Sequence, residues 1–337
     1  MYGRVVGEVV VQFGLSVRNV SQPQKGYRNE SYALTLSDGQ TVNLLFYKRE
    51  AGMVERIRQA DSFSQLAATA GYPVRDRYDS RTMQLRTSRG VSYAAVYTYL
   101  PGTTIPWEAY SRRHIKLLGW VMSDLHALGN NSPVPHEQTV VPCEMAPMVA
   151  RMTTYFYDAG VMRAMHQTLG VALSPLAPAR LERLLAAVGS IKAVTRLHMD
   201  LVRGNVLFAP SQSADRWQLK GLAVSGVIDF EKASVGPPIV DMARSLAFLM
   251  VDCPFYDEPS IERYFIQSGY MKRGASQFDA TTEIDGYTYR QLLHGLVGLF
   301  LLYDFYKFLR HTPYESLADN HHYIRTRDIL LYRGMLQ

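Results

Sequence analysis

Residues 197–208 read Leu197-His198-Met199-Asp200-Leu201-Val202-Arg203-Gly204-Asn205-Val206-Leu207-Phe208. A short apolar segment leads into a polar loop and a second apolar segment leaves it, which predicts two strands joined by that loop. The loop contains the pattern His-x-Asp-x4-Asn. In phosphoryl transfer a carboxylate receives or orients the proton of the attacking hydroxyl, and a nearby amide holds a magnesium ion. Asp200 and Asn205 are the residue types for these two tasks.

A second acidic motif stands further along the chain, Val227-Ile228-Asp229-Phe230-Glu231. It is an apolar strand that ends in a carboxylate, the kind of oxygen ligand that magnesium prefers. Phosphoryl-transfer kinases have His-Arg-Asp-Leu-x3-Asn in the catalytic loop and Asp-Phe-Gly later in the chain. Either motif alone also fits a capped turn or an ordinary strand end. Both motifs in this order predict a kinase.

The composition is that of an ordinary folded protein. The 337 residues are 47% hydrophobic and 20% charged, which is enough chain for about two domains. The two cysteines, Cys143 and Cys253, cannot build a disulfide framework or a zinc site by themselves, which indicates a reducing compartment, the cytoplasm. The net charge of +6 comes from basic residues scattered along the sequence, so we expect no nucleic-acid partner. The longest apolar run, about Leu296–Tyr303, is shorter than the roughly 18–20 residues of a spanning helix, so we expect no membrane partner.

The element patterns change at a hinge near residues 97–102. Before the hinge, strands are predicted at 16–20, 32–36, 41–47, 83–86 and 93–99, with one helix at 52–70 and an amphipathic helix at the beginning. After the hinge the patterns are mostly helical, apart from a β island at about 194–230. We therefore expect an N-terminal nucleotide-binding lobe at 1–100, a C-terminal helical lobe with the catalytic loop and substrate site at 103–337, and a ligand cleft between them.

On these motifs the chain resembles the aminoglycoside phosphotransferase and choline kinase-like family, from about residue 26 to residue 249. That family typically reads His-Gly-Asp-x4-Asn, followed by Ile-Asp-Trp or Ile-Asp-Phe and an acidic residue. The resemblance implies an α+β, two-lobed protein-kinase-like fold, with a small antiparallel-sheet lobe with one main helix and a larger mainly helical lobe. It also implies that Asp200 is the catalytic base, that His198 supports the loop, and that Asn205 and Asp229 bind Mg²⁺.

Two further positions bear on the loop. Met199 stands where the family usually has glycine, which restricts the loop backbone but removes no ligand. Asp241 matches a family Asp that braces the loop from the start of a helix. It equally fits a plain carboxylate at a helix N-terminus, where the dipole favours negative charge.

The small lobe carries the expected nucleotide contacts. Residues 24–31 contain one glycine, Gly26, and no Gly-x-Gly-x-x-Gly pattern, so they fit either a hairpin loop or a phosphate loop in which Gly26 and Arg28 take part. Kinases also need a cation on the third strand that holds the phosphates. Lys48 is the candidate, although aligning the strand with the family pattern could place that position at Leu45.

The partner of that cation should come from the 52–70 helix. On a helical wheel Asp61 lies at the edge of the apolar face, and it otherwise fits an ordinary solvated charge. By resemblance, backbone groups near Tyr97 and Tyr99 in the hinge would hydrogen-bond the nucleotide base. The same residues also fit an edge strand that ends in a Pro-Gly turn.

The expected function is a Mg²⁺-dependent transfer of the γ-phosphoryl group of ATP or GTP to a hydroxyl of a small-molecule substrate. A protein Ser/Thr kinase on the same scaffold, or a non-enzymatic nucleotide-binding pseudokinase, are the alternatives. The pseudokinase is motivated by the single-glycine loop and by Lys48, whereas intact Asp200, Asn205 and Asp229 argue against it. The sequence leaves the acceptor open. Residues 132–190 contain few acidic residues, which disfavours a polycationic acceptor. The aromatic residues at 303–308 fit a hydrophobic core as well as a binding site for a cation.

Overall fold

The computed structural model describes residues 2–25, 29–87, 90–129, 136–212, 216–273 and 280–337. The chain forms two compact units. The first consists of residues 1–104, 205–216 and 222–233, and the second of residues 105–204, 217–221 and 234–337. The expected hinge thus coincides with the end of the first unit's longest segment, and two later segments from the β island fold with that unit.

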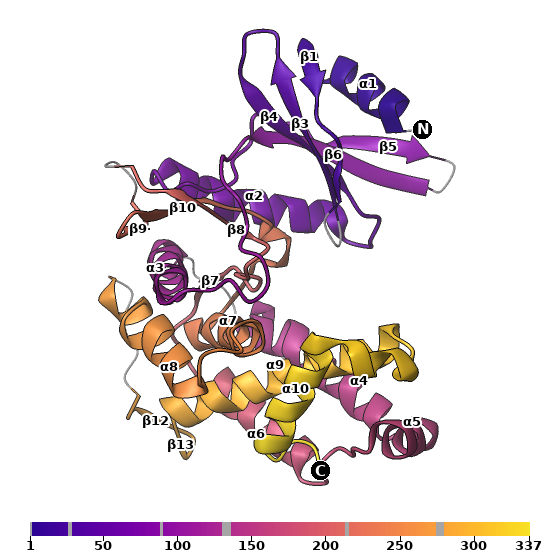
Figure 1. Ribbon diagram of the computed structural model, residues 1–337, viewed down its shortest axis with the longest axis vertical. Coiled ribbons are helices and arrows are strands. Elements are labelled where there is room, and N and C mark those ends of the chain that lie inside the picture. Colours follow the sequence, from indigo (N-terminus) through magenta and orange to yellow (C-terminus); the bar gives the residue numbers. More distant parts are fainter. Residues whose placement is uncertain (1, 26–28, 88–89, 130–135, 213–215, 274–279) are drawn as a thin grey trace. The chain divides into compact units, whose positions relative to one another are not determined.

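The first unit is built on an antiparallel sheet with the order β1-β3-β4-β6-β5, and β2 pairs with β3 (Figure 1). Its strands are β1 (Val17–Val20), β2 (Gln24–Lys25), β3 (Glu30–Leu36), β4 (Thr41–Tyr47), β5 (Met83–Thr87) and β6 (Gly90–Thr98). The predicted hairpin between β3 and β4 is confirmed. Gly39 has φ 89° and the Gln40 N–H donates to the Asp38 carboxylate at 2.9 Å, which is the chemistry of a tight turn.

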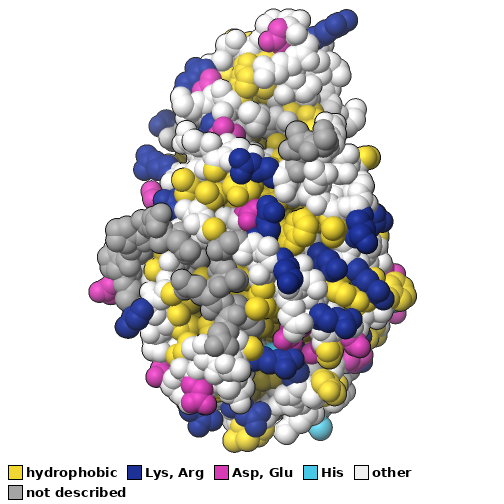
Figure 2. Space-filling model, turned by 90° about the vertical axis from the view of Figure 1, so that its left-hand side faces the viewer, with side chains coloured by type: hydrophobic (Ala, Val, Ile, Leu, Met, Phe, Trp, Pro, Cys, Tyr) yellow, Lys and Arg dark blue, Asp and Glu magenta, His cyan; other side chains and the backbone are white. Residues whose placement is uncertain are grey.

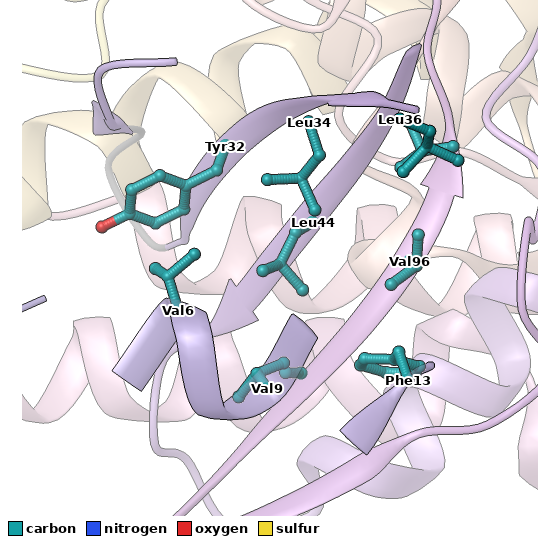
Figure 3. Close-up of a cluster of buried hydrophobic side chains, with 10 residues drawn as sticks. Val6, Val9, Phe13, Tyr32, Leu34, Leu36, Leu44 and Val96 are labelled. Carbon is teal, nitrogen blue, oxygen red and sulfur yellow. The ribbon is translucent and has the colours of Figure 1, made fainter. Parts of the chain in front are cut away.

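The two faces of the sheet are covered by different helices. Helix α1 (Tyr2–Gln12) packs Val6 and Val9 against Leu34 and Leu44 on one face, as Figure 3 shows. Helix α2 (Met53–Thr69) packs against the other face, where Leu45 is buried with residues of that helix. Strand alternation therefore decides which β4 side chains can reach α2.

A hairpin that is distant in sequence completes the first unit. It consists of β8 (Val206–Pro210) and β10 (Leu222–Val227), followed by the short helix η4 (Phe230–Lys232). The backbones of Thr103 and Phe208 exchange two hydrogen bonds, of 3.0 and 2.8 Å. Gly102 has φ 128° and a Cβ there would lie 2.2 Å from the Ser225 hydroxyl oxygen, so the close approach of the two segments requires glycine.

The second unit is mainly helical. Its α-helices are α3 (Arg112–Gly129), α4 (Ala146–Phe156), α5 (Ala159–Ala164), α6 (Ala177–Gly189), α7 (Pro238–Asp252), α8 (Glu258–Glu262), α9 (Tyr289–His311) and α10 (His321–Tyr332). Short helical turns are η1 (His136–Gln138), η2 (Val141–Met145), η3 (Met165–Leu169), η5 (Arg263–Gln267), η6 (Tyr270–Lys272) and η7 (Tyr314–Asp319). Its strands are β7 (Thr195–Leu197), β9 (Gln218–Leu219), β11 (Ser234–Gly236), β12 (Glu283–Ile284) and β13 (Tyr287–Thr288). The sheet-bearing and mainly helical units confirm the expected fold class.

Helix α9 is the long apolar helix of the second unit. It begins with a capping box, in which the Gln291 N–H donates to the Thr288 hydroxyl and the Gln291 side chain accepts from the Thr288 N–H. By length and composition it could cross a membrane, but 67% of its most apolar segment is buried inside the protein, as in a core helix.

Lys and Arg side chains stand in several separate groups on the face drawn in Figure 2, in line with their scatter in the sequence.

Two helical glycines in different surroundings test this packing. Gly119 in α3 is buried, and a Cβ there would lie 2.3 Å from the carbonyl oxygen of Phe265 and 2.7 Å from the backbone nitrogen of Tyr270. Because backbone atoms cannot move aside cheaply, we expect Gly119→Ala to lower the free energy of unfolding by about 1–3 kcal/mol or more. Urea unfolding measures this change.

Gly7→Ala in α1 is the matched control. Nothing lies within 4 Å of a Cβ at Gly7. Replacing a helical glycine by alanine in open space should raise the free energy of unfolding by up to about 1 kcal/mol. Equal effects of the two substitutions would contradict the close contact of α3 with the 265–270 segment.

Candidate active site

The catalytic-loop candidate in the second unit is held by one buried carboxylate. Asp241, in the first turn of α7, accepts hydrogen bonds from the backbone N–H groups of His198 at 2.7 Å and Met199 at 2.9 Å. The Nε2 atom of His126 in α3 lies 3.2 Å from the same carboxylate, and its Nδ1 lies 2.9 Å from the Tyr270 hydroxyl. Of the two interpretations of Asp241 in the sequence, the structure bears out the brace.

The charge on Asp241 survives its burial. Burial alone raises the pKa of this carboxyl, but the hydrogen bond and charge of His126, the charge of His198 and the backbone bond together outweigh burial. The net result is a pKa below the ordinary value for aspartate. The loop is therefore anchored to an ionised carboxylate, which makes stronger hydrogen bonds to N–H groups than a neutral acceptor does.

The brace fixes an unusual backbone at the loop. Met199 has φ 61°, the left-handed region in which glycine costs nothing and a side chain costs about 1–2 kcal/mol. This conformation explains why the family pattern has glycine at this position. The side-chain Nδ1 of His198 lies 3.3 Å from the Asp200 backbone nitrogen, and the Ser245 hydroxyl donates to the Leu201 carbonyl at 3.0 Å. His198 thus supports the loop, as expected, and Asp200 is buried at its turn.

The two metal-ligand candidates lie in the first unit, at one end of the β8–β10 hairpin. Asn205 directly precedes β8, Val206 pairs with Val227, and the Ile228 N–H donates to the Asn205 carbonyl at 2.9 Å. The backbone of Asp229, just after this strand end, is in the left-handed region with φ 62° and ψ 60°. This is a strained conformation of the kind found at functional sites. An amide and a carboxylate at the same hairpin end are oxygen donors that fit a magnesium ion. The described residues contain no group of three or more His, Cys, Asp or Glu side chains arranged for a metal.

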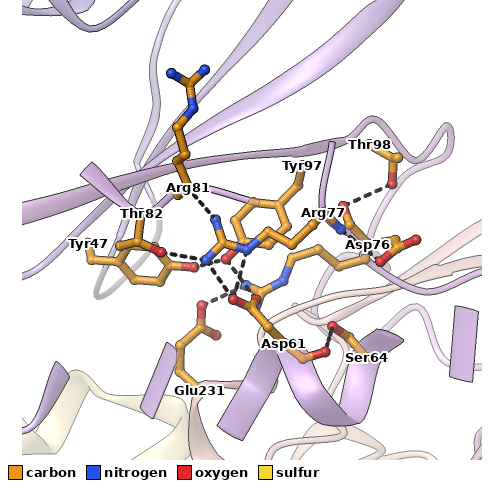
Figure 4. Close-up of polar contacts among 11 residues, drawn as sticks. Tyr47, Asp61, Ser64, Asp76, Arg77, Arg81, Thr82, Tyr97, Thr98 and Glu231 are labelled. Atoms are coloured by element: carbon orange, nitrogen blue, oxygen red, sulfur yellow. Dashed lines mark hydrogen bonds and ion pairs between the residues drawn. The ribbon is translucent and has the colours of Figure 1, made fainter. Parts of the chain in front are cut away.

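A buried polar cluster lies between the sheet and α2 of the first unit. Figure 4 shows Asp61, Tyr47, Tyr97 and Glu231 pointing toward one another. The Tyr97 hydroxyl donates to Asp61 at 3.0 Å and is also hydrogen-bonded to the Tyr47 hydroxyl. Burial raises the pKa of Tyr97 to about 12, so both phenols stay protonated donors near neutral pH.

Two arginines bring positive charge into this cluster. Arg77 donates from Nε to Asp61 at 2.7 Å. Arg75 donates from one terminal nitrogen to Glu231 at 2.6 Å, and its other terminal nitrogen lies 3.9 Å from Asp61. Both guanidinium groups stack on the Tyr97 ring, at 4.4 Å for Arg75 and 4.8 Å for Arg77. The partners of Asp61 are thus Arg77 and Arg75, whereas Lys48 was the partner expected from the sequence.

The other predicted nucleotide contacts, Lys48 and the hinge tyrosines, differ from Asp61 and from one another in their burial. Lys48 is exposed and follows the end of β4 at Tyr47, and its backbone N–H donates to the Asn29 side chain at 3.2 Å. Tyr97 is buried and its hydroxyl enters the cluster, while Tyr99 is 45% exposed just after β6. Gly26 and Arg28 lie outside the described residues.

The sequence did not predict a site role for four residues, Arg75, Arg77, Glu231 and His126. Arg75 and Arg77 lie in the connection after α2, and Glu231 was read only as part of the acidic motif. His126 was available as a core or capping residue, but its role on Asp241 depends on a contact between α3 and α7 that no local pattern reveals. No local signal marks Arg75 as a site residue, because Pro73 before it indicates only the end of the preceding helix.

A sheet-based unit, a helical unit and an aspartate loop braced from a helix start define the class of protein-kinase-like phosphotransferases. The chain belongs to the phosphotransferase enzyme family, whose pattern matches residues 19–275. The homoserine kinase of Methylorubrum populi is 26% identical over 234 residues, which are 69% of this chain and 64% of that protein. The chain thus matches less than two thirds of the length of this relative.

Solved structures show the same fold at low sequence identity. An amicoumacin kinase in complex with AMP-PNP, Ca²⁺ and Ami has a TM-score of 0.66 at 14% identity, covering 99% of this chain and 96% of that chain. A microcompartment-associated aminopropanol kinase has a TM-score of 0.60 at 12% identity, with 98% of each chain covered. The GDP complex of aminoglycoside 2′-phosphotransferase-IIIa has a TM-score of 0.58 at 13% identity, covering 98% and 97%.

The Asp241 brace predicts a pH-dependent loss of stability. Asp241→Asn removes the charge that two backbone N–H groups bind, so we expect the free energy of unfolding at neutral pH to fall by about 2–4 kcal/mol. Because the folded-state pKa is lowered, wild-type stabilisation is complete above the unfolded pKa of about 4 and is lost as the pH falls through the lower folded value. The gap between wild type and variant, measured by urea unfolding, should therefore shrink below about pH 4.

Asp158→Asn is the matched control for this experiment. Asp158 also accepts two backbone N–H groups, from Gly160 and Val161, but at the exposed N-terminus of α5. Asparagine and aspartate are equally good at such a position, so we expect a change within about 0.5 kcal/mol. A pH-independent gap for Asp241→Asn would mean that the carboxylate charge does not hold the loop.

Proposed function

We propose that this protein is a Mg²⁺-dependent kinase that transfers the γ-phosphoryl group of ATP or GTP to a hydroxyl of a small-molecule substrate. The observation that carries the proposal is the Asp200 loop, whose backbone is fixed by the buried, ionised Asp241. Membership of the phosphotransferase enzyme family supports it. The similar proteins are kinases of small molecules by name, homoserine kinase, aminopropanol kinase and amicoumacin kinase, which favours a small acceptor over a protein.

In this mechanism the chain positions groups and balances charge. The Asp200 carboxylate orients the acceptor hydroxyl and accepts its proton as the oxygen attacks the γ-phosphorus. The bond from the γ-phosphorus to the β,γ-bridging oxygen breaks, and the nucleoside diphosphate leaves with the electron pair. Asp241 and His198 act indirectly, because they hold the loop backbone on which Asp200 stands. Asn205 and Asp229 would hold Mg²⁺, which when bound neutralises charge on the phosphate oxygens. Catalysis by fixed groups of this kind avoids reorganising the site during the reaction.

We also propose that the protein works in a reducing compartment, the cytoplasm. The proposal is supported by the cysteines, Cys143 and Cys253, which are both free. Burial beside Asp252 raises the pKa of the Cys253 thiol to about 12, so this cysteine stays an inert thiol.

The metal and nucleotide site is tested by thermal unfolding with Mg²⁺ and either ATP or GTP. A ligand that binds only the folded state stabilises it, by about 2.7 kcal/mol at a free concentration of one hundred times Kd. We expect wild type to show a magnesium-dependent rise in Tm, and Asp229→Ala to lose it. A wild-type protein whose Tm is unmoved by both nucleotides at millimolar concentration would favour a non-enzymatic role.

The catalytic role of Asp200 is tested by Asp200→Asn. The variant keeps the shape of the loop but cannot accept the proton, so we expect kcat to fall by about 10²–10⁴-fold while the nucleotide-induced rise in Tm is retained. Turnover is measured as nucleotide consumption with a panel of hydroxylated small molecules. Unchanged turnover in the variant would remove Asp200 from the mechanism.

A further inference from the structure

We propose that Arg75, rather than Lys48 after β4, is the cation that binds the nucleotide phosphates in the first unit. This inference rests on the proposed kinase function. It assigns a phosphate-binding role to a residue that comes from the connection after α2 rather than from the sheet.

Strand β4 presents no cation to the face that α2 covers. Its side chains on that face are Leu45 and Tyr47, which pack with Met53 and Ile57 of the helix. Lys48 lies beyond the last residue of the strand and is exposed, and by alternation it belongs to the opposite face, with Leu44. The cation that the carboxylate of α2 requires must therefore come from elsewhere in the unit.

Arg75 supplies positive charge at this face. Its guanidinium lies 4.4 Å above the Tyr97 ring of β6, and one terminal nitrogen lies 3.9 Å from the Asp61 carboxylate of α2. The backbone of the connection is fixed here, because Val74 forms a parallel bridge with Val227 and the Arg75 N–H donates to the Val227 carbonyl at 2.9 Å. The cation is thus anchored to the same strand end that leads into the acidic motif.

Arg75 is also linked to the metal-ligand candidate. Its terminal nitrogen donates to Glu231 at 2.6 Å, and both side chains are about 5% exposed or less. Glu231 therefore holds the guanidinium beside the acidic motif that contains Asp229. A cation beside a magnesium ligand is in a position to share the charge of the same phosphates.

The Arg75 guanidinium has hydrogen-bond donors that are not used within the protein. Its Nε and one terminal nitrogen are buried and make no hydrogen bond to any residue that the structure describes. A buried charged donor without an acceptor is costly, and a phosphate presents several oxygens that match the planar fork of arginine. A phosphate group bound here would satisfy the free donors of Arg75 without breaking its bond to Glu231.

The neighbouring Arg77 does not share this property. Its Nε donates to Asp61 at 2.7 Å, and its terminal nitrogens donate to the Arg81 carbonyl at 3.1 Å and the Thr82 hydroxyl at 2.7 Å. Its side chain is therefore committed to holding Asp61 in place. Of the two arginines over Tyr97, Arg75 is the one with capacity for a ligand.

The test measures how tightly the full chain binds a nucleoside, its diphosphate and its triphosphate in the presence of Mg²⁺. The method is isothermal titration calorimetry. The nucleoside is measured by competition. Arg75→Met alone would leave Glu231 buried without its partner, so the substitution is made together with Glu231→Gln and compared with Glu231→Gln alone. We expect the added loss of Arg75 to weaken the di- and triphosphate about 10- to 100-fold and to leave the nucleoside unchanged.

Two further variants complete the design. Arg75→Lys keeps the charge but not the planar fork, so it should recover part of the affinity for the phosphorylated ligands. Arg81→Met is the matched control, because Arg81 is a half-exposed arginine of the same connection that pairs with Asp79 at 2.6 Å. We expect it to leave all three affinities unchanged.

Several outcomes would overturn the inference. Equal weakening of nucleoside and phosphorylated ligands, or no weakening at all, would make Arg75 a structural residue. A phosphate-dependent loss in Lys48→Ala but not in the Arg75 variants would return the role to Lys48. A wild-type protein that binds none of the ligands would instead count against the proposed kinase function, so the two failures are distinguishable.

Discussion

The second unit depends on one buried carboxylate that accepts two backbone N–H groups. Asp241 accepts hydrogen bonds from the N–H groups of His198 and Met199, which directly follow the last residue of β7. Backbone donors buried without a partner cost as much as a lost hydrogen bond, so the acceptor decides whether the loop can be buried at all. Because α7 starts at Pro238, Asp241 also lies in the first turn, where the helix dipole favours its charge. Together with the bonds of His198 and Ser245 to the loop, this anchor fixes the backbone on which Asp200 stands.

The first unit is organised around a buried cation in a comparable way. The bond between Arg75 and Glu231 joins segments that are far apart in sequence, and the Val74–Val227 bridge beside it does the same. A buried ion pair is weak as a source of stability, since apolar residues of similar size often serve as well. The cluster instead restricts the conformations of Asp61, Tyr97 and Glu231 together. A function of these charges explains their burial better than stability does.

The candidate catalytic and metal-binding residues could be proposed from the sequence where they lie in one local motif. Asp200, Asn205 and Asp229 each stand at a strand end, and local patterns predict strand ends and the residues beside them. Arg75 could not be predicted, because its role depends on contacts with β6, α2 and the β10 end, and no spacing encodes these. Lys48 was favoured as the nearest cation, yet β4 stops at Tyr47 and turns Leu45 toward α2. The grouping of 205–216 and 222–233 with the first unit was also invisible, since it depends on the exchange of bonds between Thr103 and Phe208.

Asp229 and Met199 lie in the candidate sites and have left-handed backbone conformations although neither is glycine. The interactions that offset this backbone strain differ between them. At Asp229 the side chain is the proposed metal ligand, so glycine would remove the strain and that proposed ligand together. At Met199 glycine would fit the backbone, but Met199 is only 8% exposed and its apolar side chain is buried. Burying such a side chain contributes about 1.5–3 kcal/mol, which is enough to offset the cost of about 1–2 kcal/mol for the conformation. The departure from the family's glycine therefore leaves the loop geometry intact, because the Asp241 bonds are made by the backbone and do not depend on the side chain at 199.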